Sequence, residues 1–350
     1  MKINLKNLLN LQIPKPAELI HSNKFTLAIV TLAMACILPL YIRNEYFISE
    51  ILTPIMIFII YASAWNILAY SGQASLGHAA FLGIGGFVSA LVAIKLGAPP
   101  IISLFIGAIF SSIIGLLIGL ACVRLKTWFL AIVTFGFSVI AATIFSQFDT
   151  AFGGILGFPP IQIVESGFPL YYLTVAFATI SVFVIYLIMK SKLGLAFKAI
   201  RENENEAKMT GINASKYRLI AFIISTFFAG LAGGLYIQST SYIDLSIFSL
   251  DHSFEPLMMA VIGGLATIEG PIIGAIIIVA IQSYLPSIDP LIRSAIGPLF
   301  PEVSNAGPYI RLLAIGIFFI IMVIFAPKGV TSLLQRLYLK IKNIKNVTKL

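Results

Sequence analysis

Long uncharged stretches divide the chain into segments about as long as a bilayer is thick. A membrane-spanning helix needs about 20 consecutive apolar residues, whereas a barrel strand alternates apolar and polar residues over about ten. These stretches do not alternate, so they predict helices. They are Phe25 to Ile42, Ile51 to Ile94, Leu96 to Val123, Thr127 to Phe148, Ser166 to Met189, Leu219 to Ile243, Gly270 to Ile288 and Leu312 to Pro327.

Two of the predicted helices are interrupted by glycine and polar residues. The block from Ile51 to Ile94 is long enough for two spans, and its break is marked by Ser71, Gly72, Gln73 and Gly77. A shorter candidate, Pro256 to Ile268, contains Gly263 and Gly264. The sequence therefore predicts an all-α integral membrane protein with about ten transmembrane helices, some of them broken at glycine.

Basic residues indicate which ends of the helices face the cytoplasm. The leader 1–24, the loop 190–218 and the tail 328–350 hold 17 of the 23 Lys and Arg residues, whereas loops 149–165 and 244–255 hold acids and no Lys or Arg. Since Lys and Arg accumulate on the cytoplasmic side, the leader, the loop and the tail should all face the cytoplasm. The leader and the tail then lie on either side of a permease domain at 25–327, which contains the loop. A cleaved signal peptide is disfavoured because its apolar core would be unusually long.

Composition supports a membrane protein and excludes several other classes. With 59% hydrophobic and 11% charged residues and a mean hydropathy of +1.00, the chain is not a soluble domain. Its net charge of +9 comes from residues that bracket apolar segments, so it does not indicate a nucleic-acid partner. Cys36 and Cys122 lie within apolar runs and do not suggest a disulfide framework.

Motifs for catalysis and metal binding are missing from the sequence. It has no Gly-x-x-x-x-Gly-Lys-Ser/Thr phosphate loop, no His-Glu-x-x-His and no Gly-x-Ser-x-Gly. The three histidines, His21, His78 and His252, are far apart. We therefore expect no catalytic residue, metal or cofactor in this chain, and any ATP must bind a partner.

The two interrupted segments are candidate parts of a substrate pathway. Gln73, Ser75 and His78 place hydrogen-bonding groups inside an uncharged block, where they must face protein or water. The alternative is that they cap a helix turn. Gly264 and Thr267 belong to the second interruption, and paired broken helices are typical of transporter binding sites. We expect no buried charge along such a path.

The basic loop 190–218 contains a predicted surface helix. Residues from Leu195 to Met209 include no Gly or Pro, and Gly211 follows as a stop. A narrow, mainly apolar face is predicted to insert into a groove on a partner; it comprises Leu193, Phe197, Ile200, Glu204 and Ala207, with Arg201, Glu202 and Glu206 at its rim. The alternative is an ordinary connection that lies on lipid.

Four segments together carry a family resemblance. Asn66 to Gly86, Lys198 to Tyr236, Gly263 to Ala275 and Arg311 to Gly329 resemble, in that order, the LivM-type permease subunit of branched-chain amino acid ABC importers. The sequence departs from the family at Asn205 and Glu206, where Glu-Ala often precedes the alanine, and at Ala266, where glycine is frequent.

The resemblance implies a function and a set of partners. It implies a permease for leucine, isoleucine or valine that assembles with a second homologous permease, two ATP-binding subunits and an extracytoplasmic solute-binding protein. The loop 190–218 would then couple the permease to the ATP-binding subunits. Permeases for urea and short-chain amides are of the same general type and remain an alternative.

Two other classes remain open on the residues alone. An ion-coupled secondary transporter would need an intramembrane carboxylate, and Glu269 is the candidate, although the charge pattern puts it at the cytoplasmic edge. A structural or channel-forming membrane protein would also lack an ATP site.

Overall fold

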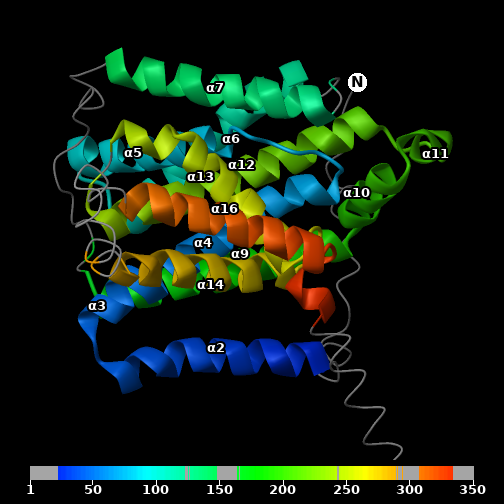
Figure 1. The fold of residues 1–350 in the computed structure, drawn as a ribbon. Helices are drawn as coiled ribbons and strands as arrows, with labels where there is room; N and C mark the ends of the chain where they lie inside the picture. Colours follow the sequence, from blue (N-terminus) through cyan, green and yellow to red (C-terminus); the bar gives the residue numbers. More distant parts are fainter. Residues whose placement is uncertain are drawn as a thin grey trace, which may run out of the picture.

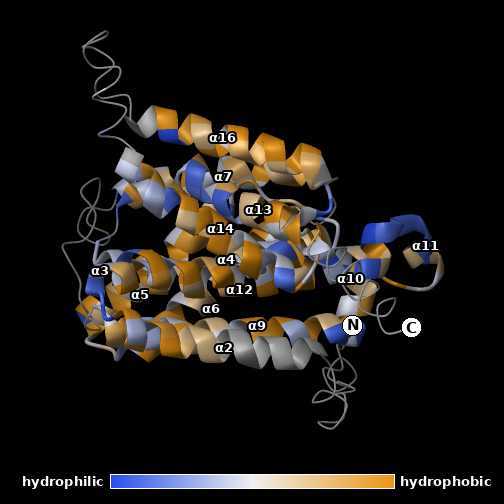
Figure 2. Ribbon diagram, turned by 60° about the horizontal axis from the view of Figure 1, so that its bottom comes forward, coloured by the Kyte–Doolittle hydropathy of each residue, from blue (hydrophilic) through white to orange (hydrophobic). Residues whose placement is uncertain are grey.

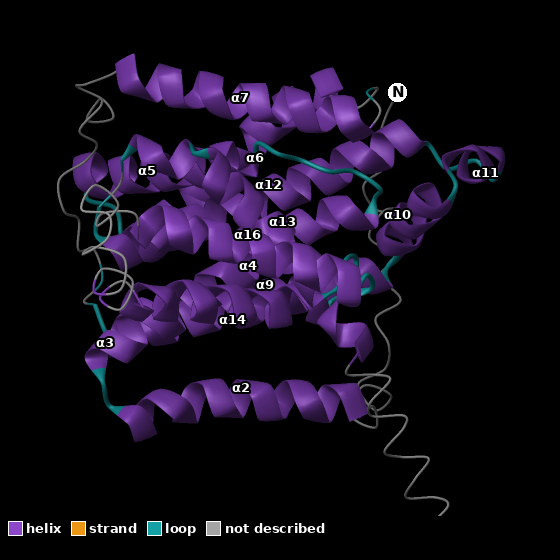
Figure 3. Ribbon diagram, in the orientation of Figure 1, coloured by secondary structure: helices purple, strands orange, loops and turns teal. Residues whose placement is uncertain are grey.

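The computed structural model describes residues 23–122, 127–147, 166–242, 244–288 and 307–333, together with residues 125, 164, 290 and 294. Within these residues there is no strand, and the helices lie roughly side by side in one bundle (Figures 1 and 3). Three predicted segments lie outside the described part. They are the leader before Asn23, the loop 149–165 except residue 164, and the tail beyond residue 333.

The helix order follows the predicted spans closely. The chain runs through α2 (Asn23–Ile42), α3 (Glu45–Phe47), a π-helix (Ile48–Leu52), α4 (Thr53–Tyr70), α5 (His78–Leu96), α6 (Pro100–Cys122), α7 (Thr127–Gln147) and α9 (Phe168–Lys190). It continues through α10 (Lys192–Glu202), α11 (Glu204–Met209), α12 (Ala214–Thr240), a 3₁₀ turn (Leu245–Phe248), α13 (Leu250–Gly263), α14 (Glu269–Tyr284), a second 3₁₀ turn (Leu285–Ile288) and α16 (Gly307–Phe325).

Eight described helical segments are long and apolar enough to cross a membrane. The two remaining predicted spans are α2, which has 20 residues, and α13, which has 14 and is therefore too short to cross alone. Helix α2 packs on α9, because Tyr171 Oη donates to the carbonyl of Ala35 at 2.7 Å and Tyr172 Oη to that of Cys36 at 3.1 Å. The all-α multi-pass prediction is confirmed.

Helices α4 and α12 form the centre of the bundle. All of α4 is buried except Pro54, Met56 and Tyr70, as expected for a helix that is apolar on every side. Peripheral helices such as α16 consist largely of hydrophobic residues, whereas α11 is mainly hydrophilic (Figure 2). Several of the large apolar side chains of α16 are exposed. This contrast places α10 and α11 outside the apolar bundle, at one end of it (Figure 1).

Small residues allow the central helices to approach closely. A side chain at Gly115 would overlap Thr226, and one at Gly230 would overlap Ser111. The Ser111 hydroxyl lies 3.0 Å from the carbonyl oxygens of Phe81 and Thr226, so it links α6 to both α5 and α12. These small residues, Ser111 and Gly115 on α6 and Thr226 and Gly230 on α12, therefore lie on the faces along which the helices pack.

Candidate functional site

The segment between α4 and α5, residues 71–77, is the first helix break, and it turns back along α4. Trp65 Nε1 donates to the carbonyl of Ser75 at 2.8 Å, although Trp65 is on the preceding helix. The amide of Leu76 donates to Thr134 Oγ1 of α7 at 3.2 Å, and the amide of Ala79 donates to Ser253 Oγ of α13 at 3.3 Å. Irregular backbone at membrane depth is tolerated when protein groups satisfy it in this way.

The predicted pathway residues of the first break lie inside the chain. Ser75 and His78 are fully buried, and Gln73 is 6% exposed. The Ser71 hydroxyl donates to Gln73 Oε1 at 3.0 Å, and His78 Nε2 lies 3.4 Å from Ser225 Oγ of α12. His78 Nδ1 is buried without a hydrogen-bond partner. A buried, unpaired nitrogen is unusual enough to need an explanation.

The second helix break, residues 264–268, joins α13 to α14 and is held by Asn66 of α4. The amide of Ala266 donates to Asn66 Oδ1 at 2.8 Å, and Asn66 Nδ2 donates to the carbonyl of Thr267 at 2.7 Å. Thr267 Oγ1 donates to the Gly264 carbonyl at 2.7 Å and accepts from the Gly270 amide at 3.0 Å. Both Gly264 (φ 138°) and Ala266 (φ 52°) have positive φ. Alanine is strained in this left-handed conformation, which glycine would adopt without a steric cost.

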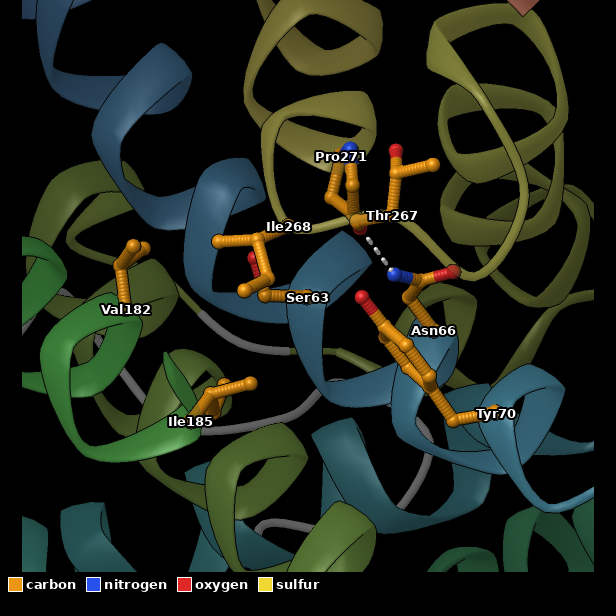
Figure 4. Close-up of a pocket in the computed structure, with 8 residues that line it drawn as sticks. All are labelled: Ser63, Asn66, Tyr70, Val182, Ile185, Thr267, Ile268 and Pro271. Carbon is orange, nitrogen blue, oxygen red and sulfur yellow. Dashed lines mark hydrogen bonds between the residues drawn. The ribbon is translucent and has the colours of Figure 1, made fainter. Parts of the chain in front are cut away.

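A small pocket lies beside the second break (Figure 4). It is lined by Ser63, Asn66, Tyr70, Val182, Ile185, Thr267, Ile268 and Pro271, and the space open to the centres of water-sized spheres is about 10 Å³. That is room for about one water molecule. The pocket therefore does not hold a whole solute in this conformation.

The predicted surface helix of the cytoplasmic loop is divided in two by Asn203. Asn203 has extended backbone angles, accepts hydrogen bonds from the amides of Asn205 and Glu206, and donates to Glu206 Oε1 at 2.6 Å. This reciprocal capping ends α10 and begins α11. The prediction of one continuous helix from Leu195 to Met209 is wrong at this residue. Gly211 has positive φ and follows the end of α11, as predicted.

The apolar face of α10 and α11 points inward. Phe197, Ile200 and Ala207 are buried, with exposures of 0%, 2% and 3%, and they pack against their own chain. The prediction that this face inserts into a partner groove is corrected: α9 and α12 already cover it. Arg201, Glu202 and Glu206 are exposed, as are Leu195 and Met209, so these residues form the outer surface.

Glu204 fastens α11 to the first turns of α12. Its carboxylate forms ion pairs with Lys208 Nζ at 2.7 Å and with Arg218 Nη2 of α12 at 2.8 Å. The hydrogen bond from Lys208, supported by the charge of Arg218, lowers the pKa of Glu204 below its ordinary value. Glu204 therefore serves an internal contact and is ionised at neutral pH.

Sequence reasoning missed a polar cluster on α13 and α14. Among the Asp, Glu, Lys and Arg residues in the described part of the chain, only Glu255 is buried, which corrects the expectation of no buried charge. Its carboxylate lies 2.8 Å from His252 Nδ1 and accepts from Gln282 Nε2 at 3.0 Å, and Tyr61 Oη of α4 donates to the His252 carbonyl at 3.0 Å. The spacing of three residues between His252 and Glu255 on a helix is the signal that could have revealed the pair.

No metal site is formed by the described residues, because no three His, Cys, Asp or Glu side chains come together there. The candidate site consists of two helix breaks that are hydrogen-bonded to α4, a buried polar cluster, and the two-helix element α10–α11 at one end of the bundle.

Comparisons with known proteins give this arrangement a context. A family described as the permease component of the branched-chain amino acid transport system matches residues 47–326, which include both breaks and α10 to α12. No solved structure matches the chain significantly.

Individual relatives agree with the family match. The high-affinity branched-chain amino acid transport system permease protein LivM of Escherichia coli K12 is 27% identical over 325 residues, which cover 84% of this chain and 72% of that protein. In Methanocaldococcus jannaschii, a probable branched-chain amino acid transport permease protein LivM is 25% identical (71% of this chain, 77% of the relative). A probable LivH permease of the same organism is 28% identical (71% and 80%).

Proposed function

This chain belongs to the family of branched-chain amino acid transport permease components, and from that premise we propose that it imports leucine, isoleucine or valine as one half of the membrane path of an ATP-binding-cassette importer. The observation that carries the proposal is the family match over residues 47–326. The importer would lie in the cytoplasmic membrane, as its family implies. The basic loops would face the cytoplasm.

The proposed complex supplies what the chain itself lacks. Because the sequence has no phosphate-binding loop, ATP hydrolysis is assigned to two partner subunits. Similarity to both a LivM and a LivH protein of one organism supports a second, homologous permease as the other half of the path. An extracytoplasmic solute-binding protein completes the proposal.

The substrate pathway is proposed to run beside the two helix breaks. Its proposed residues are Gln73, Ser75, His78, Gly264 and Thr267. Gly264, Ser75 and His78 are buried in the described conformation, so in this proposal they border the path only after the bundle opens. The unpaired Nδ1 of His78 supports the idea, because a polar group without a partner in one conformation can gain one in another.

The two-helix element formed by α10 and α11 is proposed to lie on the cytoplasmic side, where it contacts the ATP-binding subunits. It is called the cytoplasmic element below. Phe197, Ile200, Ala207 and Gly211 shape the element, and Glu204 anchors it to α12. Arg201 and Glu202 are exposed and are proposed to make the contact itself. The cytoplasmic element would thus contact the ATP-binding subunits through its polar outer surface and the rest of the permease through its apolar inner surface.

Uptake by a reconstituted complex tests the function. The chain is co-expressed with the proposed second permease, ATP-binding subunits and solute-binding protein. The complex is placed in liposomes and supplied with radiolabelled leucine or urea. We expect leucine uptake that requires ATP and is unaffected by collapsing ion gradients. Uptake of urea but not leucine would reassign the substrate, and uptake driven by an ion gradient without ATP would overturn the importer assignment.

A further inference from the structure

Two adjacent residues of α4 hold both helix breaks. Trp65 donates from Nε1 to the carbonyl of Ser75 in the first break, and Asn66 binds Ala266 and Thr267 in the second. The breaks are separated by almost 200 residues in sequence, yet they are attached to neighbouring positions on one helix. Any movement of this part of α4 therefore reaches both.

The side-chain amide of Asn66 matches the backbone of the second break. The Ala266 amide can only donate and the Thr267 carbonyl can only accept, so one orientation of the Asn66 amide satisfies both. Asn66 is 2% exposed, so water does not readily replace it. Figure 4 shows the Asn66 side chain reaching across to Thr267.

The first break is in direct contact with the cytoplasmic element. Gly72 has φ of 72°, and a Cβ there would lie 3.3 Å from the Cα of Arg201 in α10. The backbone after α4 thus rests on α10 without an intervening side chain. A displacement of α10 would press on the same end of α4 that carries Trp65 and Asn66.

The second break lies beside a narrow gap on one side and a close contact on the other. The pocket that adjoins Asn66 and Thr267 has room for about one water molecule, whereas the backbone of Gly264 meets the backbone of Gly329 after α16. The loop is therefore held between α4 and the segment after α16, and Asn66 is the side chain that attaches it to α4.

We propose that Asn66 is a positioning residue for transport, which makes the second break follow the movement of α10 and the end of α4. This inference rests on the proposed function, because it assigns α10 to the contact with an ATP-binding subunit. Asn66 itself need not touch the solute. Its role is to convert a displacement at the cytoplasmic surface into a displacement of the loop 264–268.

The test compares two buried hydrogen-bonding residues in the full complex. Asn66→Leu fills a similar volume and removes both bonds to the second break. Ser138→Ala is the matched control, because the Ser138 hydroxyl donates to the Phe248 carbonyl at 2.9 Å and is equally buried, but touches neither break. We expect Asn66→Leu to hydrolyse ATP normally while leucine uptake per ATP falls about tenfold, and Ser138→Ala to keep the wild-type ratio.

A second measurement follows the loop directly. In chains with Cys36 and Cys122 replaced by alanine, a cysteine is placed at Leu265, which is 49% exposed, and its labelling rate is compared before and after vanadate trapping with ATP. The rate should change on trapping in the wild type and stay constant in Asn66→Leu. A wild-type change in labelling together with a wild-type uptake ratio in Asn66→Leu would overturn the inference.

The outcomes separate this inference from the proposed function. Absence of ATP-driven uptake by the wild-type complex would refute the function, and the labelling at position 265 would still decide the role of Asn66. If Asn66→Leu does not assemble, Asn66→Ser is measured instead, since its short hydroxyl cannot reach both backbone groups. Unchanged uptake per ATP and unchanged labelling in that variant would equally refute the role.

Discussion

His78 is the residue for which a pathway role and a packing role predict different results. It stacks on Tyr61 with ring centroids 5.5 Å apart, and its Nε2 lies near Ser225 Oγ. If the proposed pathway role holds, His78→Leu and Gln73→Leu should assemble normally and change uptake or solute preference. Assembled complex and ATP-driven uptake are measured on the same preparation. Lost assembly would instead assign a structural role, since each unpaired partner group costs about 1–3 kcal/mol.

Glu255 and His252 should depend on each other for stability. His252→Leu leaves the Glu255 carboxylate with Gln282 but without its ionic partner, and removing one member of a buried pair typically costs about 3–5 kcal/mol. We expect a lower unfolding temperature of the purified permease for His252→Leu, and partial recovery when Glu255→Gln is added. Thr143→Ala, at an exposed position of α7, is the control and should unfold as the wild type does. A double variant less stable than either single one would contradict the pairing.

At the residue scale, the sequence predicted positions better than contacts. Gln73, Ser75 and His78 could be singled out because they interrupt an uncharged block, and the structure does contain a helix break there. Asn66 could not be linked to Ala266 and Thr267, because the bonds join residues about 200 positions apart. The run of acids without Lys or Arg predicted an outer loop that ends at Glu255. In the structure, Ser249 caps α13, so Glu255 lies within that helix, where its side chain is buried.

At the element scale, α10 and α11 show what a periodic pattern can and cannot predict. The spacing of Phe197, Ile200 and Ala207 correctly indicated one buried face. Periodicity does not say what covers that face. The spacing therefore left a partner groove and the lipid surface as interpretations, and it did not reveal that α9 and α12 of the same chain cover the face. The break at Asn203 did have a signal, because Asn three residues before Glu206 is a capping pattern.

Asn203→Ala should loosen α11. The variant removes the side chain that accepts from the amides of Asn205 and Glu206, and loss of such a cap costs about 1 kcal/mol. Amide hydrogen exchange in residues 204–209 should become several-fold faster. Asn205→Ala, on the exposed side of the same turn, is the control and should exchange as the wild type does. Equal exchange in the two variants would show that the cap does not hold the element.

The crossing of α5 and α12 should not accept a side chain. A Cβ at Gly85 would overlap the backbone of Gly230, whereas a Cβ at Gly136 on α7 would have nothing within 4 Å. Gly85→Ala should therefore reduce the yield of folded permease and its unfolding temperature, and Gly136→Ala should not. Fluorescence-detected gel filtration after a heating series measures both. Equal stability would mean that the helices can separate at this crossing without cost.

At the scale of the whole molecule, the arrangement of helices follows the hydrophobic pattern, and the basic residues predict how the bundle is oriented in the membrane. A cysteine at Asn203, which is exposed at the end of α10, should be labelled by a membrane-impermeant reagent only when the cytoplasmic side is open to it. Labelling of intact cells would invert the topology. A cysteine at Leu250, at the start of α13, is the companion position and should show the opposite accessibility if the predicted outer loop 244–255 is correct.

The burial of α4 has a consequence for how the protein is made. Tyr61 and Asn66 bind His252 and Thr267, which are synthesised 191 and 201 residues later. At about 5–20 residues per second, the ribosome needs roughly 10–40 s to supply the partner of Asn66. During that time most of the helices that surround α4 in the folded protein have not been synthesised. The polar side chains of α4 then need other contacts, with α5, with the insertion machinery or with a chaperone. The most buried helix of the folded protein is therefore the one that waits longest for its native contacts and is most prone to misassembly during synthesis.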